Sequence, residues 1–402
     1  MKGRTIIKGG HLWDGLTNRL LPNGAILIEN GRIRAAGAAA EILTAPYDEL
    51  FDWPEATLMP GLIDSHTHLS MDASLDNYLD HMSDPVAVLT LRATAMMRKD
   101  LASGVTLCRC LGDKEFLDVA CRHAVQEGLV EGPHLLVATR GIRAPQGHGF
   151  VGYPFSGPGE IRKAIKENIT RGADFIKIYI TGTLKGTGSL PSYLSEEEIR
   201  VAIEEAHDAG VRVASHCVGG IGLDWAIQYK LDTLEHAYQI TDEQVEHLAH
   251  SSTQLVLTPG PILNEAVVRR LPDHLIQGHL DERDLIFRNM ARCVSAGIPF
   301  ALGTDGLHGE LVKEIEFAEE LGASRLQSLQ AVTLHGARIC GIEKETGSLE
   351  KGKRADVIAV EGNPFRDLSA LRKIICVVRE GSVASRQSGG EVKTTPHGLL
   401  LG

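Results

Sequence analysis

An apolar run leads directly into two histidines in the stretch Met59-Pro-Gly-Leu-Ile-Asp-Ser-His-Thr-His-Leu69. In an extended strand, residues two apart point to the same face. His66 and His68 therefore project together, where two imidazoles can grip one cation. A His-x-His pair alone is also compatible with two loop histidines. The apolar residues before it favour the end of a buried strand, and the rest of the chain has to decide between the two.

From residue 56 onward the chain alternates between strand and helix patterns. Strands are expected over 57–64, 104–110, 134–140, 173–180, 211–216, 231–235, 254–258 and 298–304. Helices are expected between and after them over 85–102, 115–128, 160–171, 195–209, 221–229, 241–250, 281–296 and 310–321. Eight such units predict an α/β fold, a distorted (β/α)8 TIM barrel. An open doubly wound sheet is disfavoured because no glycine-rich phosphate turn follows the first strand.

Both ends of the chain have a different sequence pattern, which predicts short strands separated by turns. Asn30-Gly31 is a strong hairpin signal between the strands expected over 24–29 and 32–36. We expect residues 1–56 and 346–402 to form one small β-sandwich domain, with the barrel over 57–345. One further helix is expected over 324–340. The tail over 386–402 is rich in Gly, Ser and Thr and is expected to be mobile.

Composition limits the classes of protein to consider. The chain has 402 residues, a hydrophobic fraction of 43% and a formal net charge of −11. The negative charge disfavours nucleic-acid binding, and no segment approaches 18 apolar residues, so no membrane span is expected. The N-terminus lacks the apolar core of a signal peptide. Seven scattered cysteines suggest reduced thiols and a cytoplasmic enzyme. We expect a small-molecule substrate and a homo-oligomer, with neither nucleic acid nor membrane as partner.

Polar side chains recur where the expected strands end. The carboxyl ends of barrel strands converge on one mouth, so these side chains should meet. They are His66, His68, Lys177, His216, His236 and Asp305. A single histidine at a strand end is more often a hydrogen-bonded core residue, but six groups at one pole are hard to attribute to chance. Four imidazoles and a carboxylate suit zinc or a similar divalent ion.

Lys177 does not fit this set as an ammonium, which two dications would repel. A neutral lysine can instead react with CO2 to form a carbamate, an anionic oxygen ligand that can bridge two metals. The alternative is a lysine that leaves the barrel or pairs with an acid, and the residues alone leave both open.

The motifs that carry these residues resemble the amidohydrolase superfamily over almost the whole chain. They are Pro60 to His68, Ile176-Lys-Ile178, Ser215-His216, Leu234-Glu-His236, Gly303-Thr-Asp305 and Gly347 to Asp356. The finer resemblance is to prolidase-like dipeptidases and imidazolonepropionase-related hydrolases. The resemblance implies two divalent ions, with zinc expected. One would be held by His66, His68 and Asp305, the other by His216 and His236, with carboxylated Lys177 bridging them.

The activity expected from the resemblance is hydrolysis of an amide-type C–N bond in a small molecule. Two metals would lower the pKa of a bridging water from about 15.7 towards about 7, and Asp305 would shuttle its proton to the leaving nitrogen. His148 and, less directly, Tyr238 are candidate donors to the developing oxyanion. A dipeptide or N-acyl amino acid is the favoured substrate, and a cyclic amide, urea or carbamate is the alternative.

Loops should set the substrate. Long loops over 141–159 and 259–280 are expected to close the mouth, and the loop over 181–192 departs from the family's usual version. Arg140, Arg143 and Lys185 are the nearest basic candidates for a substrate carboxylate, although each is also compatible with a solvated surface charge.

Two other interpretations stay open. A deaminase of the same superfamily would lack the lysine ligand and carry a glutamate just after the strand-5 histidine, whereas Cys217 follows His216 here. A non-catalytic scaffold would have lost metal ligands, and all six positions are filled.

Overall fold

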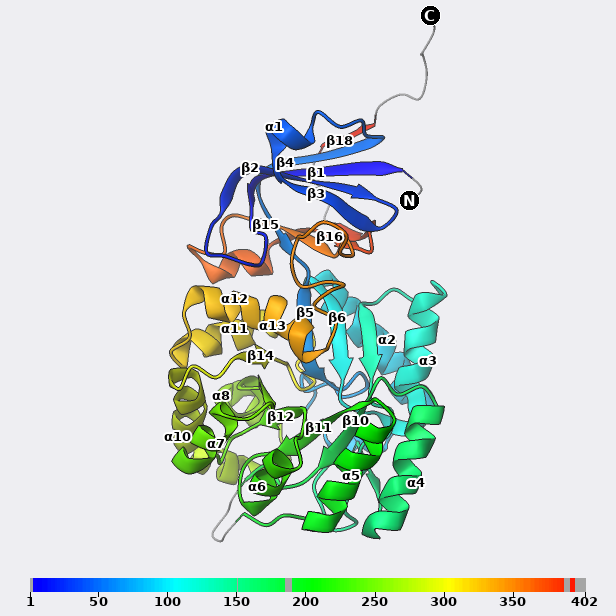
Figure 1. Ribbon diagram of the computed structural model, residues 1–402, viewed down its shortest axis with the longest axis vertical. Helices are drawn as coiled ribbons and strands as arrows, with labels where there is room; N and C mark the ends of the chain where they lie inside the picture. The colour runs from blue at the N-terminus through cyan, green and yellow to red at the C-terminus, as the bar shows by residue number, and fades with distance from the viewer. Residues whose placement is uncertain (1–2, 150, 185–189, 387–390, 395–402) are drawn as a thin grey trace, which may run out of the picture. The chain divides into compact units, whose positions relative to one another are not determined.

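The computed structural model of the protein describes residues 3–149, 151–184, 190–386 and 391–394. The chain divides into two compact units (Figure 1). One unit comprises Met1–Ile63, Lys99–Leu107 and Arg325–Gly402, and the other comprises Asp64–Arg98 and Cys108–Ser324.

Parallel strands form the α/β part of the chain. A seven-stranded sheet has the order β14-β13-β12-β11-β10-β8-β9, and a three-stranded sheet has the order β5-β6-β7. Their bounds are β5 (Leu62–Thr67), β6 (Val105–Cys110), β7 (His134–Val137), β8 (Ile142–Arg143), β9 (Tyr153–Pro154), β10 (Phe175–Tyr179), β11 (Arg212–Cys217), β12 (Thr233–His236), β13 (Gln254–Leu257) and β14 (Phe300–Leu302).

Backbone hydrogen bonds join the two sheets at two places. The Asp174 amide donates to the Val137 carbonyl (2.8 Å), and the Asp305 amide donates to the His66 carbonyl (2.8 Å). The strands between these two bonds are β5, β6, β7 and β10 to β14. Seven of them correspond to strands expected from the sequence, whereas the strand expected over 57–64 is divided between the end of β4 (Glu49–Pro60) and the start of β5. The expected α/β fold with a TIM-barrel-like part is confirmed.

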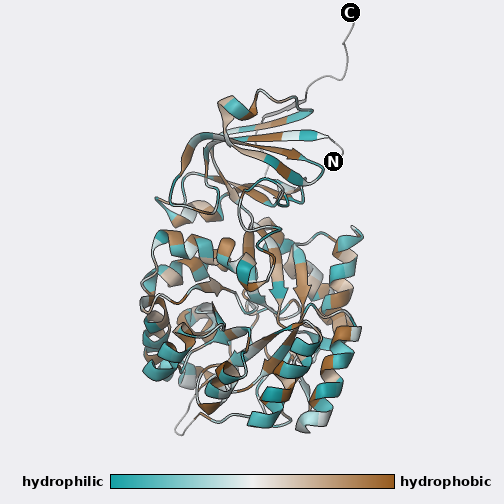
Figure 2. Cartoon of the chain, viewed as in Figure 1, coloured by the Kyte–Doolittle hydropathy of each residue, from teal (hydrophilic) through white to brown (hydrophobic). Residues whose placement is uncertain are grey.

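Helices alternate with these strands and carry both polar and apolar bands along their length (Figure 2), as helices with one buried side do. Their bounds are α2 (Val86–Ala102), α3 (Leu117–Gln126), α4 (Gly157–Thr170), α5 (Glu196–Asp208), α6 (Ile221–Gln228), α7 (Asp242–Ala249), α8 (Gly260–Leu263), α9 (Glu265–Val268), α10 (Asp273–Ser295) and α11 (Leu311–Glu320), with 3-10 turns at Asp80–Ser83 and Lys114–Phe116. Helix α5 begins at the predicted capping box of Ser195 and Glu198. Within the described part of the chain, no helix combines the length and apolar character that a membrane crossing requires.

The expectation of a long loop over 259–280 is wrong. Helices α8 and α9 and the first turns of α10 occupy most of this segment. The side chain of Asn264 accepts a hydrogen bond from the Ala266 amide and caps α9. Val267, Val268 and Leu271 are buried in an apolar cluster. Tertiary packing therefore stabilises short helices that are too brief to show a clear sequence period.

The β-rich unit combines both ends of the chain in one eight-stranded sheet. Seven of its strands have the order β17-β16-β15-β4-β1-β2-β3, and the eighth, β18, pairs with β4. The bounds are β1 (Arg4–Leu12), β2 (Leu21–Glu29), β3 (Arg32–Ala38), β4 (Glu49–Pro60), β15 (Val357–Glu361), β16 (Ile374–Arg379), β17 (Ser382–Arg386) and β18 (Glu391–Thr394), with helix α1 (Ala39–Ile42) and a 3-10 turn at Leu368–Arg372. The predicted hairpin is present: Glu29 pairs with Arg32, and Asn30 and Gly31 adopt φ of 52° and 76°.

Two details of this unit differ from expectation. The helix expected over 324–340 is two helices, α12 (Arg325–Ala331) and α13 (Leu334–Ile339), separated at Thr333, whose φ of −136° is not helical. Within the tail expected to be mobile, strand β18 is ordered against β4. The remainder of that tail, 387–390 and 395–402, lies outside the described residues.

Candidate metal centre

The six predicted ligands lie at the carboxyl ends of the strands and line one cavity of about 440 Å³. His66 is in β5, Lys177 in β10, and His216 and His236 are in β11 and β12. His68 follows β5 and Asp305 follows β14. All of these side chains are buried except that of Asp305, which is 21% exposed. The barrel therefore brings together residues that are far apart in the sequence.

Imidazole rings form a continuous row along this pole. The ring centroids of His66 and His236 are 4.7 Å apart, and those of His236 and His216 are 4.4 Å apart. The His68 ring adjoins that of His66 at 5.6 Å. Ligand atoms of His66, His236 and Asp305 all lie within 4.8 Å of one another, a separation at which one ion can be shared.

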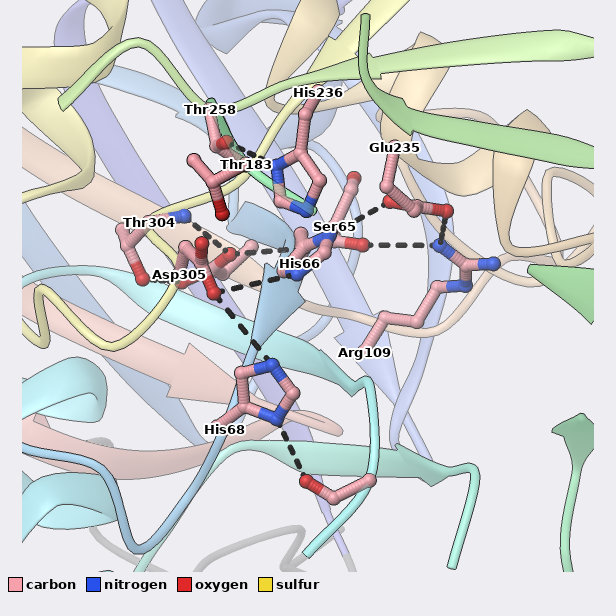
Figure 3. A network of polar contacts seen from close by, with 12 residues as sticks. Ser65, His66, His68, Arg109, Thr183, Glu235, His236, Thr258, Thr304 and Asp305 are labelled. Carbon is pink, nitrogen blue, oxygen red and sulfur yellow. Dashed lines mark hydrogen bonds and ion pairs between the residues drawn. The ribbon is translucent and has the colours of Figure 1, made fainter. Parts of the chain in front are cut away.

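Hydrogen bonds at the Nδ1 atoms decide which nitrogen of each ring faces the cavity (Figure 3). His66 Nδ1 lies 2.8 Å from the Glu235 carboxylate, and His68 Nδ1 lies 2.7 Å from the Gly112 carbonyl. Both partners only accept hydrogen bonds, because the pKa of Glu235 is lowered to about 2, so each Nδ1 carries the proton. The Nε2 atoms of His66 and His68 are left with lone pairs.

His236 is oriented by a second network of the same kind. Its Nδ1 lies 2.7 Å from Thr258 Oγ1, and the hydroxyl of Tyr238 lies 2.7 Å from both Thr258 Oγ1 and the Thr258 carbonyl. The carbonyl must accept from Tyr238, so the Thr258 hydroxyl can donate to Tyr238 and accept from His236 Nδ1. This assignment leaves Nε2 of His236 with its lone pair as well.

Asp305 faces these lone pairs rather than protons. Its Oδ1 lies 3.4 Å from His66 Nε2 and 3.6 Å from His68 Nε2. Three electron-rich atoms thus converge with no proton between them. Such a group fits a cation, and the donor set of two imidazoles and a carboxylate fits a divalent metal.

Lys177 lies beside this group in the lining of the same cavity. The side chain is fully buried, and Nζ has no hydrogen-bond partner among the described residues. Burial is the main cause that lowers the pKa of Lys177 to about 8. Nε2 of His216 is likewise buried without a partner in the described part of the chain. The lowered pKa raises the share of unprotonated amine, the form that reacts with CO2, above that of an exposed lysine, and both atoms are available to a metal.

Two of the predicted ligands have unusual backbone conformations. His236 has φ of 81° and Asp305 has φ of 50°, in the left-handed region that non-glycine residues seldom adopt. Such strain clusters at functional sites, where the surrounding structure imposes it.

Sequence reasoning missed a buried ion pair behind His66. Glu235 Oε1 accepts from Arg109 Nη1 (3.0 Å) and from Thr233 Oγ1 (2.7 Å), while Oε2 binds His66. Arg109 also donates to the Ser65 carbonyl. Charged residues inside apolar strands were the available signal, since Arg109 stands between two buried cysteines of β6.

Asp64 was also missed, although it lies in the same strand as His66 and only two residues before it. Its carboxylate accepts from the amides of His66 and Thr304 (both 3.1 Å) and from Thr304 Oγ1 (2.6 Å). Next to Thr304, a Cβ added to Gly303 would lie 2.3 Å from His66 Cβ. Only glycine permits this approach, which brings Asp305 beside the histidines.

The two candidate oxyanion donors lie in the cavity lining but differ in their contacts. The His148 ring adjoins that of His216 (4.4 Å), and its Nε2 lies 3.4 Å from Thr183 Oγ1. Burial lowers the pKa of His148 to about 4, so the ring is neutral and one of its nitrogens is a donor. Tyr238 instead donates its hydroxyl proton to Thr258, which leaves it no proton for a substrate in this arrangement.

Of the basic residues considered for a substrate carboxylate, Arg140 and Arg143 do not line the described cavity. Arg140 pairs with Glu167, and Arg143 donates to the carbonyls of Ala144, Pro145 and Gly147. Lys185 lies outside the described residues.

Comparison with known proteins adds a family to this geometry. The model of the amidohydrolase family matches residues 57–394. The chain is 27% identical to ochratoxinase from Aspergillus niger, over 92% of this chain and 83% of that protein. It is 25% identical to imidazolonepropionase from Fusobacterium nucleatum, over 83% of this chain and 84% of that protein. A solved Xaa-Pro dipeptidase with bound methionine superposes with a TM-score of 0.82 at 25% identity, covering 94% of this chain and 99% of the other. The resemblance expected from the sequence is confirmed.

Proposed function

The chain belongs to the amidohydrolase family and is a hydrolase acting on carbon–nitrogen bonds; we propose that it is metal-dependent and cleaves an amide-type bond in a small molecule. The observation that carries the metal dependence is the convergence of Asp305 Oδ1 with the proton-free Nε2 atoms of His66 and His68. A carboxylate and two lone pairs at 3.4–3.6 Å repel one another unless a cation lies among them.

The residues divide between two ions. His66, His68 and Asp305 would hold one and His216 and His236 the other, with Lys177, carboxylated by CO2, between them. Imidazole and carboxylate ligands suit zinc or a similar divalent ion, and we expect zinc. Bound ions of this kind would acidify water and polarise a carbonyl group.

The chain's own residues supply the proton movements. The exposed part of the Asp305 carboxylate can accept a proton from the attacking water and deliver it to the leaving nitrogen. A neutral His148 can donate a hydrogen bond to the carbonyl oxygen as negative charge develops on it. Tyr238 contributes to the same pole by fixing Thr258 and, through it, the His236 ring.

Two classes of substrate are compatible with this chemistry. Dipeptides and N-acyl amino acids carry a carboxylate next to the scissile bond, and the dipeptidase among the similar structures supports this class. Cyclic amides, ureas and carbamates need carry no charge. No cluster of Lys and Arg lines the described cavity, so a phosphate, which needs cationic clamps, is disfavoured.

Metal content and product identity test the proposal together. Elemental analysis should find close to two divalent ions per chain. Lys177→Ala should lose at least one, whereas Lys163→Ala, an exposed control on α4, should lose none. One ion per fully active chain would contradict the bridging role of Lys177.

Mass spectrometry over a panel of amides, ureas and carbamates should find an acid and an amine. Release of ammonia from an aromatic base, with every amide intact, would indicate a deaminase instead.

A further inference from the structure

One side of the cavity is an apolar wall built from two segments of the chain. Met71, Tyr78 and Met82 come from the connection between β5 and α2, and Ile262, Leu271 and Leu275 come from the segment spanning α8 to α10. Most of these side chains pack in one cluster around the cavity. This apolar wall faces a substrate with hydrocarbon surface, and burial of such surface is favourable.

Outside the metal centre, the described lining of the cavity offers a substrate carboxylate no lysine or arginine; the histidines of this part of the lining are His148, His274 and His279. Lys177 is its only lysine or arginine among the described residues, and it lies in the metal centre. Arg140 is paired with the Glu167 carboxylate, and Arg143 donates to the backbone carbonyls of Ala144, Pro145 and Gly147. His279 Nδ1 lies 2.9 Å from the Leu275 carbonyl and must donate to it, so a neutral His279 presents a lone pair at Nε2. The lining also includes Gln146, Thr183 and Tyr193, which are uncharged.

We propose that the substrate is an uncharged amide, carbamate or urea whose group beyond the scissile bond is apolar. This inference rests on the proposed function and narrows it. A carboxylate placed against the side chains of Leu271 and Leu275 would lose hydration to two apolar groups, whereas an alkyl or aryl group would be stabilised there. The volume of about 440 Å³ lies in the lower part of the range typical for pockets that hold small organic ligands.

The proposed reaction is the hydrolysis of the bond between the carbonyl carbon and nitrogen. A C–O bond forms between water and the carbonyl carbon, and the bond from that carbon to nitrogen breaks. One proton of the water passes to the nitrogen, which leaves as an amine. No oxidant, reductant or further co-reactant is required.

Matched substrates separate the two classes. Each pair has one acyl group, acetyl, benzoyl or phenylacetyl, joined either to glycine or to isobutylamine, so that a carboxylate is replaced by an isopropyl group of similar shape. With the metal-loaded enzyme, we expect kcat/KM to be at least tenfold higher for the isobutylamide. Equal or faster cleavage of the glycine amides would overturn this inference while leaving amide hydrolysis intact. Cleavage of neither member in any pair would overturn the proposed function, and this inference with it.

Variants then test the cause of the preference. Leu275→Arg places a cation on the apolar wall and should shift the ratio of kcat/KM towards the glycine amides by at least tenfold. Leu285→Arg, on the exposed side of the same helix α10, should leave the ratio within twofold. An unchanged ratio in Leu275→Arg would overturn the role of the missing cation. Lys185→Ala should leave the ratio unchanged; a tenfold loss confined to the glycine amides would overturn the inference by assigning that cation to Lys185.

Discussion

Glu235→Gln should disturb both the stability of the barrel and the metal centre. Glu235 is fully buried and Arg109 is 3% exposed, so neither charge is solvated. The substitution leaves the guanidinium with the Ser65 carbonyl and Thr233 Oγ1 but without an anion. Loss of one partner from a buried ion pair typically costs about 3–5 kcal/mol.

The same change should switch the tautomer of His66. Glutamine has one accepting oxygen and one donating nitrogen, whereas the carboxylate of Glu235 accepts on both sides. If the amide oxygen faces Arg109, the amide nitrogen faces His66 Nδ1 and forces it to accept. The proton then moves to Nε2, where it blocks the lone pair directed at Asp305, and metal affinity should fall about 10- to 100-fold.

Arg109→Met, combined with Glu235→Gln, should restore much of the lost stability and metal affinity. Arg109→Met alone leaves Glu235 as an unpaired buried acid and should also destabilise the protein by about 3–5 kcal/mol. In the double variant both charges are gone. The amide nitrogen of the glutamine that replaces Glu235 can then turn to Thr233 Oγ1, while its oxygen accepts from His66. The double variant should therefore be more stable than either single variant and should regain metal.

Three measurements check this reasoning. Urea unfolding of EDTA-treated protein gives the order of stability, nitrogen NMR of labelled histidine reports the protonated ring atom, and elemental analysis gives metal content. Glu204→Gln, which removes an exposed partner of Arg200 (2.7 Å), is the matched control and should cost less than about 1 kcal/mol. A loss below about 1 kcal/mol in Glu235→Gln, or a double variant no more stable than the single ones, would refute the argument.

Three further outcomes are expected. Asp305→Asn should retain part of its metal but lose turnover by about three orders of magnitude or more, since an amide does not accept the proton; near-normal turnover would direct attention to His148. His148→Ala should lower kcat more than it raises KM if its hydrogen bond forms mainly in the transition state, and the reverse pattern would make it a binding residue. Burial, with a smaller effect of Asp113, raises the pKa of Asp118 to about 7, so the folded chain binds the extra proton and stability from this group falls as the pH rises from about 4 to about 7. Urea midpoints across this range should therefore decline more steeply in the wild type than in Asp118→Asn, and parallel slopes would speak against it.

The candidate ligands of the metal centre could be predicted from the sequence because strand periodicity is a local property. Two histidines separated by one residue share a face, and the end of a strand is visible where the apolar run stops. Lys177, His216 and His236 were found in the same way, since each stands in a short apolar run of its own. The eight strand–helix repeats then implied that these separate ends meet at one pole. No contact between distant residues had to be known.

The surroundings of those ligands could not be predicted, because they depend on contacts between distant residues. Arg109 and Glu235 are 126 positions apart, and the local sequence around either residue does not predict its partner. The same is true of His68 with the Gly112 carbonyl and of Asp64 with Thr304, whose partners depend on how the barrel closes. The hydrogen-bond partners at Nδ1 determine the tautomers of His66 and His68. In these tautomers the Nε2 lone pairs face Asp305.

The apolar wall is likewise determined by tertiary packing and could not be predicted from the sequence pattern. Residues 259–280 have no helical period long enough to predict α8 and α9, because such short helices are stabilised by burial and caps and not by propensity. Leu271 and Leu275 line the cavity because those helices form there. Local residue spacing therefore predicts the ligands of the site, whereas the character of its substrate depends on side chains that only folding brings to the cavity.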